Sequence, residues 1–356
     1  MSYEWPVDVD NLFSERYPQM IKAGVPAHDV DAVRAAITQM WSDAPGGWVY
    51  EWSALAARYA AAGSHQLAAL AYGYAKFPTL ADAAKRVAFA HQLEQYLLAA
   101  SGFGVDFDRR VLKLPYQGGH TEVAVHILAA AGLPADAPVL LVSGGIDTWK
   151  MDLHGMFVLM AMHTGARVVA FDIAGTGESS VPMTPDGGAE IVRGLAAEAR
   201  AMGSGIVAYL GLSMGGYYSA RSGLAGDVDA AVVLGGPVEA AFGRDVGTFQ
   251  FGMDGIVGNA LGFDHKPTAE EEAAQFGPFS LRPLLDQDTN VPMLVVNGAD
   301  DVHVPQHDTL VFQGRRDTEV HLIPGTGHCA VSEWDDVLPM ICGWLQRTLS
   351  STRSIA

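Results

Sequence analysis

Three residue types along this chain have the chemistry needed to attack a carbonyl group, and the first is a serine. Ser213 lies at the centre of GLSMG, residues 211–215, directly after the apolar run 206–210. A serine hydroxyl is a poor nucleophile until a base takes its proton, and a sharp strand-to-helix turn flanked by glycines presents such a serine to the base. The pentapeptide therefore predicts a nucleophile elbow.

An acid and a histidine follow the serine in the chain. Asp300 and Asp301 come after the apolar run 291–298, and His328 ends the turn PGTGH after the run 319–323. An acid at a strand end can accept the Nδ1 hydrogen of a histidine and stabilise the imidazolium. The order Ser213, Asp301, His328 therefore predicts a catalytic triad. Asp300 is an alternative acid, because one residue of register decides which carboxylate faces the histidine.

A fourth segment, VSGGID at residues 142–147, closes another predicted strand. Gly144 and Gly145 let the backbone pass close to a substrate oxygen, so the amides of Ile146 and Met214 are a candidate oxyanion hole. A plain Gly-Gly turn is the structural alternative. Asp147 has three candidate roles, which are binding substrate, protonating a leaving group, and capping a helix that begins near residue 148.

The elements that must hold these residues are short β-rich runs separated by helical patterns. Eight such runs follow residue 110, at 111–114, 122–128, 138–143, 167–173, 206–212, 230–235, 292–298 and 319–323. The later runs are continuously apolar, which is typical of parallel strands covered on both faces. We predict an α/β fold with a mostly parallel eight-stranded sheet, helices on both faces, and function at the carboxyl ends of the strands.

The chain before this region has helical periodicity throughout. Trp52, Leu55, Ala56 and Tyr59 recur at i, i+3, i+4 and i+7, which indicates packed amphipathic helices. We predict an N-terminal helical cap over residues 1–107 and a catalytic core over 108–356. Within the core, 237–288 is a long connection that we interpret as a lid-like insertion.

Apolar side chains in that insertion suggest a substrate pocket. Together with the N-terminal helices they are predicted to shape an enclosed apolar pocket for a small molecule with an apolar portion. An ordinary helical core is the alternative. The side chains concerned are Phe242, Phe249, Phe251, Met253 and Leu261.

Composition excludes several classes of function. The 356 residues carry a formal net charge of −18, which opposes binding to nucleic acids and to anionic membranes. No apolar run approaches the roughly 20 residues of a membrane span, and the acidic N-terminus does not resemble a signal peptide, so we expect a cytoplasmic protein. Cys329 and Cys342 are expected to be free buried thiols.

Metal and phosphate binding are weakly supported. His303 and His307 lie four residues apart near two aspartates, but Pro305 between them argues against a shared helix face. The loop GTGES at 175–179 lacks the spacing of a phosphate-binding loop and is predicted to be a tight structural turn. We predict no metal.

The segments from residue 138 to 328 resemble the α/β-hydrolase superfamily, with GLSMGG as the elbow and DIAGTGES after the fourth strand. The N-terminal AYGYAKF and QLEQY segments and the SGGID segment resemble the fermentation-respiration-switch-protein-like esterase and 2,6-dihydroxypseudooxynicotine hydrolase group. This resemblance implies a helical cap over the active site, no cofactor, and often a homodimer. The spacing Gly298-x-x-Asp301-x-x-x-Pro305 fits the family pattern and favours Asp301 over Asp300.

We therefore predict a serine hydrolase of esters, thioesters or amides that works through Ser213, His328 and Asp301. Relatives in the resembled group also cleave C–C bonds beside a ketone, and a carboxylate at the position of Asp147 is associated with that chemistry. A C–C hydrolase or cyclase with the same triad is thus the alternative. A non-catalytic ligand-binding shell is a minor third hypothesis, because it predicts a broken triad.

Overall fold

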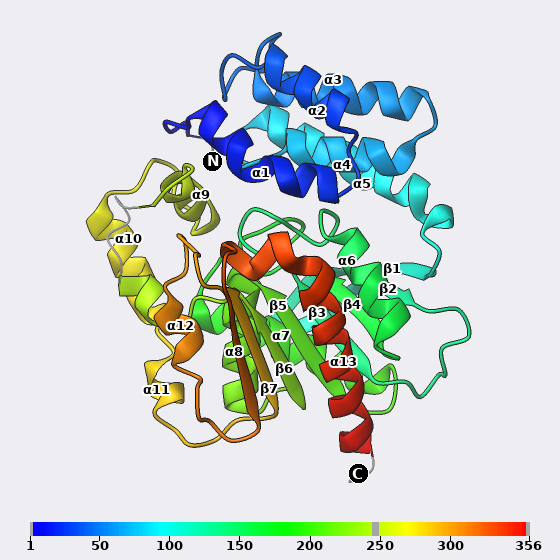
Figure 1. Ribbon diagram of the computed structural model, residues 1–356, viewed down its shortest axis with the longest axis vertical. Helices are drawn as coiled ribbons and strands as arrows, with labels where there is room; N and C mark the ends of the chain where they lie inside the picture. The colour runs from blue at the N-terminus through cyan, green and yellow to red at the C-terminus, as the bar shows by residue number, and fades with distance from the viewer. Residues whose placement is uncertain (1–2, 244–248, 354–356) are drawn as a thin grey trace. The chain divides into compact units, whose positions relative to one another are not determined.

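The computed structural model describes residues 3–243 and 249–353, which form two compact units (Figure 1). The helical unit contains the described residues up to Gly104, together with Met151–His154 and Phe249–Thr268. The core unit contains the rest of the described chain. The segment 237–288 is thus divided between the two units, and its residues 244–248 lie outside the described part of the chain.

The core unit is built on an eight-stranded sheet with the order β1-β2-β4-β3-β5-β6-β7-β8. β2 pairs antiparallel with β1 and β4, and the remaining neighbours pair parallel, which confirms the predicted fold. All eight predicted runs are strands. The strands are β1 (Asp106–Tyr116), β2 (Gly119–Ala129), β3 (Val139–Ser143), β4 (Arg167–Phe171), β5 (Val207–Leu212), β6 (Ala230–Leu234), β7 (Met293–Gly298) and β8 (Thr318–Ile323).

The apolar composition of the central strands accounts for their position in the sheet. Every residue of β3, β5, β6 and β7 is buried, whereas the edge strand β8 is partly exposed along its length. Helices α7 and α8 pack against each other and against the sheet, and α13 contacts β6. The helices assigned wholly to this unit are α7 (Pro185–Ala201), α8 (Met214–Ala225), α10 (Ala269–Phe276), α11 (Arg282–Leu285), α12 (Gln306–Leu310) and α13 (Trp334–Arg353). Helix α6 (His154–His163) begins at the last residue of the 151–154 segment and continues into the core unit.

The helical unit is organised around buried aromatic side chains. Trp48 and Trp52 are fully buried, and the Trp52 ring lies 5.0 Å from Tyr74 and 6.3 Å from Phe13. The apolar residues that recur at helical spacing around Trp52 therefore contribute to a core between helices. The helices of this unit are α1 (Val9–Lys22), α2 (Ala27–Ala36), α3 (Trp48–Ala61), α4 (His65–Ala75), α5 (Ala83–Ala99) and α9 (Met253–Ala260).

Helix α9 and the residue before it pack through glycines against the N-terminal arm, residues 3–7. Trp5 Nε1 donates to the Gly252 carbonyl at 2.9 Å, and Tyr3 Oη donates to the Gly255 carbonyl at 3.0 Å. A Cβ on Gly255 would lie 2.1 Å from the Trp5 ring, so only glycine permits this approach. Residues about 250 positions apart are thereby packed together.

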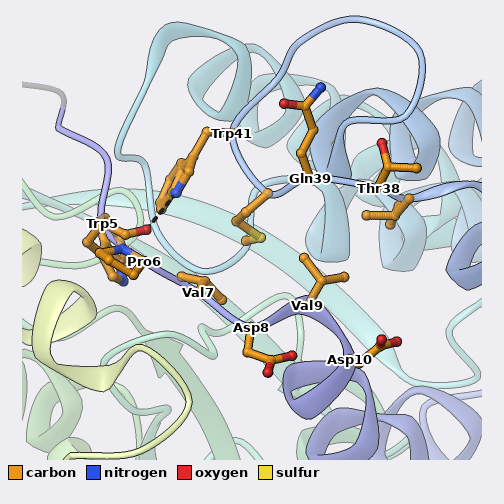
Figure 2. A pocket seen from close by; sticks show the side chains of 11 residues that line it. Trp5, Pro6, Val7, Asp8, Val9, Asp10, Thr38, Gln39 and Trp41 are labelled. Atoms are coloured by element: carbon orange, nitrogen blue, oxygen red, sulfur yellow. Dashed lines mark hydrogen bonds between the residues drawn. The ribbon is translucent and has the colours of Figure 1, made fainter.

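A pocket of about 680 Å³ opens beside this arm (Figure 2). Its walls are residues 5–10 and 37–41, and the Trp41 indole donates to the Trp5 carbonyl at 2.8 Å. The pocket contains none of the predicted catalytic side chains.

Within residues 3–243 and 249–353, no helix is both long and apolar enough to cross a membrane. The same residues contain no group of three or more His, Cys, Asp or Glu side chains arranged to hold a metal ion.

Candidate active site

Ser213 lies in the sharp turn between β5 and α8, where its φ is 51° and its ψ is −123°. Few L-residues adopt a positive φ, and such strain persists only where the surroundings enforce it. The flanking glycines are required by close contacts, because a Cβ on Gly211 would lie 2.0 Å from the Gly215 carbonyl oxygen. A Cβ on Gly215 would lie 2.3 Å from the Gly144 carbonyl oxygen. The segment 211–215 thus has the geometry of a nucleophile elbow.

Asp301, and not Asp300, pairs with His328. His328 Nδ1 lies 2.7 Å from Asp301 Oδ2, so the ring N–H donates to the carboxylate. The other oxygen, Oδ1, accepts the backbone amides of His303 at 2.7 Å and Val304 at 3.1 Å. The Asp301 side chain is fully buried, whereas Asp300 is exposed. The register at the end of β7 therefore turns only the second aspartate toward the histidine.

The pKa values of this pair shift in opposite directions. Burial alone would raise the pKa of Asp301, but the positive charge of His328 and several donated hydrogen bonds lower it to about 2. Desolvation alone would lower the pKa of His328, but the negative charges of Cys329, when ionised, and Asp301 raise it well above its usual range. The carboxylate thus stabilises the protonated imidazole, as a catalytic base requires.

The serine and histidine segments meet at one carbonyl group. Leu234, the last residue of β6, accepts the Ser213 backbone amide at 2.8 Å and the Cys329 thiol at 3.3 Å. His328 side chain is 25% exposed and Ser213 is half-buried, so both remain accessible. In the described part of the chain, no direct hydrogen bond joins Ser213 to His328; such bonds commonly tighten only when substrate binds.

The candidate oxyanion segment lies against the serine. A Cβ on Gly145 would be 2.8 Å from Ser213 Cβ and 3.2 Å from its Oγ, so this glycine allows the close approach. The Gly145 amide donates to the Thr148 carbonyl at 2.9 Å. By contrast, the amides of Ile146 and Met214 donate to no acceptor among residues 3–243 and 249–353.

Asp147 is mostly buried, with 8% of its surface exposed. Its Oδ1 accepts the hydroxyl of the neighbouring Thr148 at 3.1 Å. No helix begins near residue 148, because α6 starts only at His154, so the predicted role of Asp147 as a helix cap is wrong. Substrate binding and protonation of a leaving group stay predictions.

Asn297 was not among the residues predicted from the sequence. It is fully buried in β7, and it contacts Asp301 through its amide nitrogen and the amide of Cys329 through its amide oxygen. The available signal was an Asn-Gly pair at the end of an apolar strand, which by itself indicates only a turn.

A second ionic cluster follows β4. Lys150 Nζ pairs with Asp172 and lies 2.8 Å from Glu178, which also pairs with Arg109 at 2.5 Å. The backbone amides of Lys150 and Glu178 donate to Asp172 at 3.0 and 2.9 Å. The loop 175–179 is therefore wrapped around a buried carboxylate, which fits a tight structural turn.

The sheet order and the elbow after β5, with an acid after β7 and a histidine after β8, define an α/β-hydrolase. The sequence profile described as "Esterase FrsA-like" matches residues 38–350, so the chain belongs to the FrsA-like esterase family. The resemblance inferred from the sequence is thereby confirmed, and the protein is an enzyme of the α/β-hydrolase type.

Solved structures show the same fold. The 2,6-dihydroxy-pseudo-oxynicotine hydrolase is 20% identical, with a TM-score of 0.75, over 94% of this chain and 96% of that one. Wild-type AbyA5 is 19% identical, with a TM-score of 0.74, over 97% and 99%. Est1E from Butyrivibrio proteoclasticus is 14% identical, with a TM-score of 0.51, over 67% and 99%. No curated protein sequence is significantly similar to this chain.

Proposed function

We propose that this enzyme is a serine hydrolase that cleaves an ester, thioester or amide bond in a small molecule through an acyl-enzyme. Ser213 is the nucleophile, His328 the general base and Asp301 the acid that orients it. The observation that carries this proposal is the 2.7 Å contact between Asp301 Oδ2 and His328 Nδ1. The elbow serine lies next to this pair, because the Leu234 carbonyl accepts both the Ser213 amide and the thiol of Cys329, the residue after His328.

In the first half-reaction, His328 Nε2 takes the hydroxyl proton while Ser213 Oγ attacks the substrate carbonyl carbon. Asp301 accepts the Nδ1 hydrogen and stabilises the imidazolium. The imidazolium then returns the proton to the leaving group, and the acyl group stays on Ser213. In the second half-reaction, water gives a proton to His328 and attacks the acyl carbon. His328 returns this proton to Ser213 Oγ as the acyl–oxygen bond breaks, which releases the acid and restores the serine.

The charge that develops on the carbonyl oxygen needs donors. The amides of Ile146 and Met214 are proposed to supply them, because neither is used within the described chain and Gly145 keeps that segment against Ser213. Loss of one such donor typically costs about 2.7–4 kcal/mol of transition-state stabilisation.

Cleavage of a C–C bond is the second candidate, and the burial of Asp147 beside Ile146 favours it. A carbanion leaving group needs a proton, which a carboxyl group next to the oxyanion segment could supply. Product analysis of a β-diketone and an acyl ester separates the two candidates. If Asp147→Asn abolishes only C–C cleavage, the second candidate is favoured, and equal effects on both substrates argue against a special role.

The primary test is labelling with a fluorophosphonate, followed by intact-mass measurement, together with turnover of p-nitrophenyl acetate. We expect one adduct on the wild type and none on Ser213→Ala, with turnover lost in parallel. Ser219→Ala is the matched control, since Ser219 lies in α8, the helix that follows Ser213, and its hydroxyl donates to the carbonyls of Tyr209 and Val232, both at 2.9 Å. Labelling that persists in Ser213→Ala would refute the assignment of the nucleophile.

A further inference from the structure

Asn297 joins the two segments that carry the acid and the base. It is the fifth residue of the six-residue strand β7 and is fully buried. A primary amide in such a position has two donors and an acceptor oxygen, and leaving these groups unpaired in the interior is costly. Each end of this side chain has a partner, and the two ends bind different segments.

The nitrogen end holds the acid. Asn297 Nδ2 donates to Asp301 Oδ2 at 2.8 Å, and this is the same oxygen that accepts the His328 Nδ1 hydrogen at 2.7 Å. The second carboxylate oxygen is occupied by the backbone amides of His303 and Val304. With both oxygens engaged, the carboxylate cannot rotate away from His328 without losing hydrogen bonds.

The oxygen end holds the backbone after the histidine. Asn297 Oδ1 accepts the amides of Gly298 at 2.9 Å and Cys329 at 3.0 Å. Cys329 and Ala330 both have positive φ, at 55° and 49°. Two consecutive non-glycine residues in this conformation need external restraint. The bond to Asn297 is one such restraint, and it acts on the residue next to His328.

We propose that Asn297 is a positioning residue that keeps the His328 ring against Asp301 by binding both segments at once. This inference rests on the proposed function, because it assigns Asn297 to the base of that mechanism. Asn297 itself does not touch the reacting atoms.

The test measures the His328 ring directly, by NMR titration of protein labelled in its histidine rings. The His328 signal is assigned by its absence from His328→Gln. His303, whose ring centroid lies 5.3 Å from that of His328, is followed in the same spectra, and Cys329 and Asp301 are the other titratable groups beside the ring. In Asn297→Ala the strained turn relaxes, and we expect the pKa of His328 to fall toward 6.5. We also expect kcat to fall about 10²-fold with little change in KM, as misplacement of a catalytic group by about 1 Å predicts.

Three further variants sharpen the result. Asn297→Asp keeps an oxygen for the Cys329 amide, so its His328 pKa should stay at or above the wild-type value. Asn290→Ala is the matched control, because Asn290 precedes β7 and its amide binds Val291 and Arg316 carbonyls, both at 2.8 Å. This control should lower stability without moving the His328 pKa. Asn297→Ser, whose shorter side chain cannot join both segments, is used in the same way if the alanine variant does not fold.

An unchanged His328 pKa in Asn297→Ala, or an equal change in Asn290→Ala, would overturn the inference. The titration needs no turnover, so the two proposals are tested separately. A wild type that does not react with the fluorophosphonate refutes the proposed function, while the pKa comparison still decides the role of Asn297.

Discussion

Two buried carboxylates lie just beyond strand ends of the same sheet, and they are paired differently. Asp172 follows β4 and pairs with Lys150, which is fully buried. Asp301 follows β7 and pairs with His328, whose side chain is 25% exposed. Both carboxylates also accept backbone amides.

The partner determines what each pair can do. Desolvation alone would lower the pKa of Lys150, but the charges of Asp172 and Glu178 outweigh it and raise this pKa above 10.5, so the ammonium keeps its proton. An imidazole has a second nitrogen that can exchange a proton while the first stays bound to the acid. Burial of an acid is therefore common to both sites, and a partly exposed imidazole partner distinguishes the candidate catalytic one.

The largest expected effect comes from removing the charge of Asp301. We expect Asp301→Asn to lower kcat by about 10⁴-fold, because the histidine loses its orienting acceptor. Asp172→Asn should mainly lower the free energy of unfolding and leave kcat per folded molecule within about tenfold. Steady-state kinetics with p-nitrophenyl acetate, normalised to the folded fraction, checks both. Equal losses of kcat in the two variants would contradict the comparison.

Removing the cation of the structural pair should affect stability instead. Lys150→Met leaves the buried carboxylate of Asp172 without its ammonium, and we expect a loss of about 3–5 kcal/mol in the free energy of unfolding. Lys85→Met is the matched control, since Lys85 is equally buried but desolvation lowers its pKa despite the opposing charge of Asp82. Its replacement should cost less. Urea unfolding curves measure both, and a larger loss for Lys85→Met would show that the charges in the β4 cluster are not coupled as described.

The smallest effect is a pH dependence of stability that separates the two pairs. Asp301 has a folded pKa of about 2 against an ordinary 3.8, so its contribution of about 2 kcal/mol is present above 3.8 and lost as pH falls through 2. The raised pKa of Lys150 acts at the other end, because its contribution is present below 10.5 and lost as pH rises through the folded value.

The free energy of unfolding, measured between pH 2 and 11, should therefore depend less on pH at the acidic end in Asp301→Asn than in the wild type. In Lys150→Met, it should depend less on pH at the alkaline end. An acid-side slope identical to that of the wild type in Asp301→Asn would refute the assignment of this titration to the Asp301 carboxylate.

The sheet was predictable from local patterns because buried parallel strands are short apolar runs. The antiparallel strands β1 and β2 are longer than the predicted runs and cover Asp106–Tyr116 and Gly119–Ala129. These strands lie at a partly exposed edge of the sheet and include polar residues, so apolar runs identify only part of them. The glycines around Ser213 were equally readable, since the elbow requires them locally.

Contacts between distant segments were not predictable in this way. The packing of α9 on Trp5 depends on glycines about 250 residues away. The ring of Phe242 packs against Tyr217 of α8, whose ring lies 5.5 Å away. No periodicity within 237–288 specifies these partners.

By itself, the sequence determined the class of chemistry, because a serine, an acid and a histidine in this order after apolar runs can meet only at one edge of a parallel sheet. Tertiary structure decided which aspartate serves the histidine, since Asp300 and Asp301 differ only in the direction of their side chains. It also decided the place of Asn297, whose partners in the acid and histidine segments lie 4 and 32 residues away. Hydrogen bonds between separate segments depend on the folded backbone, and no local pattern encodes them.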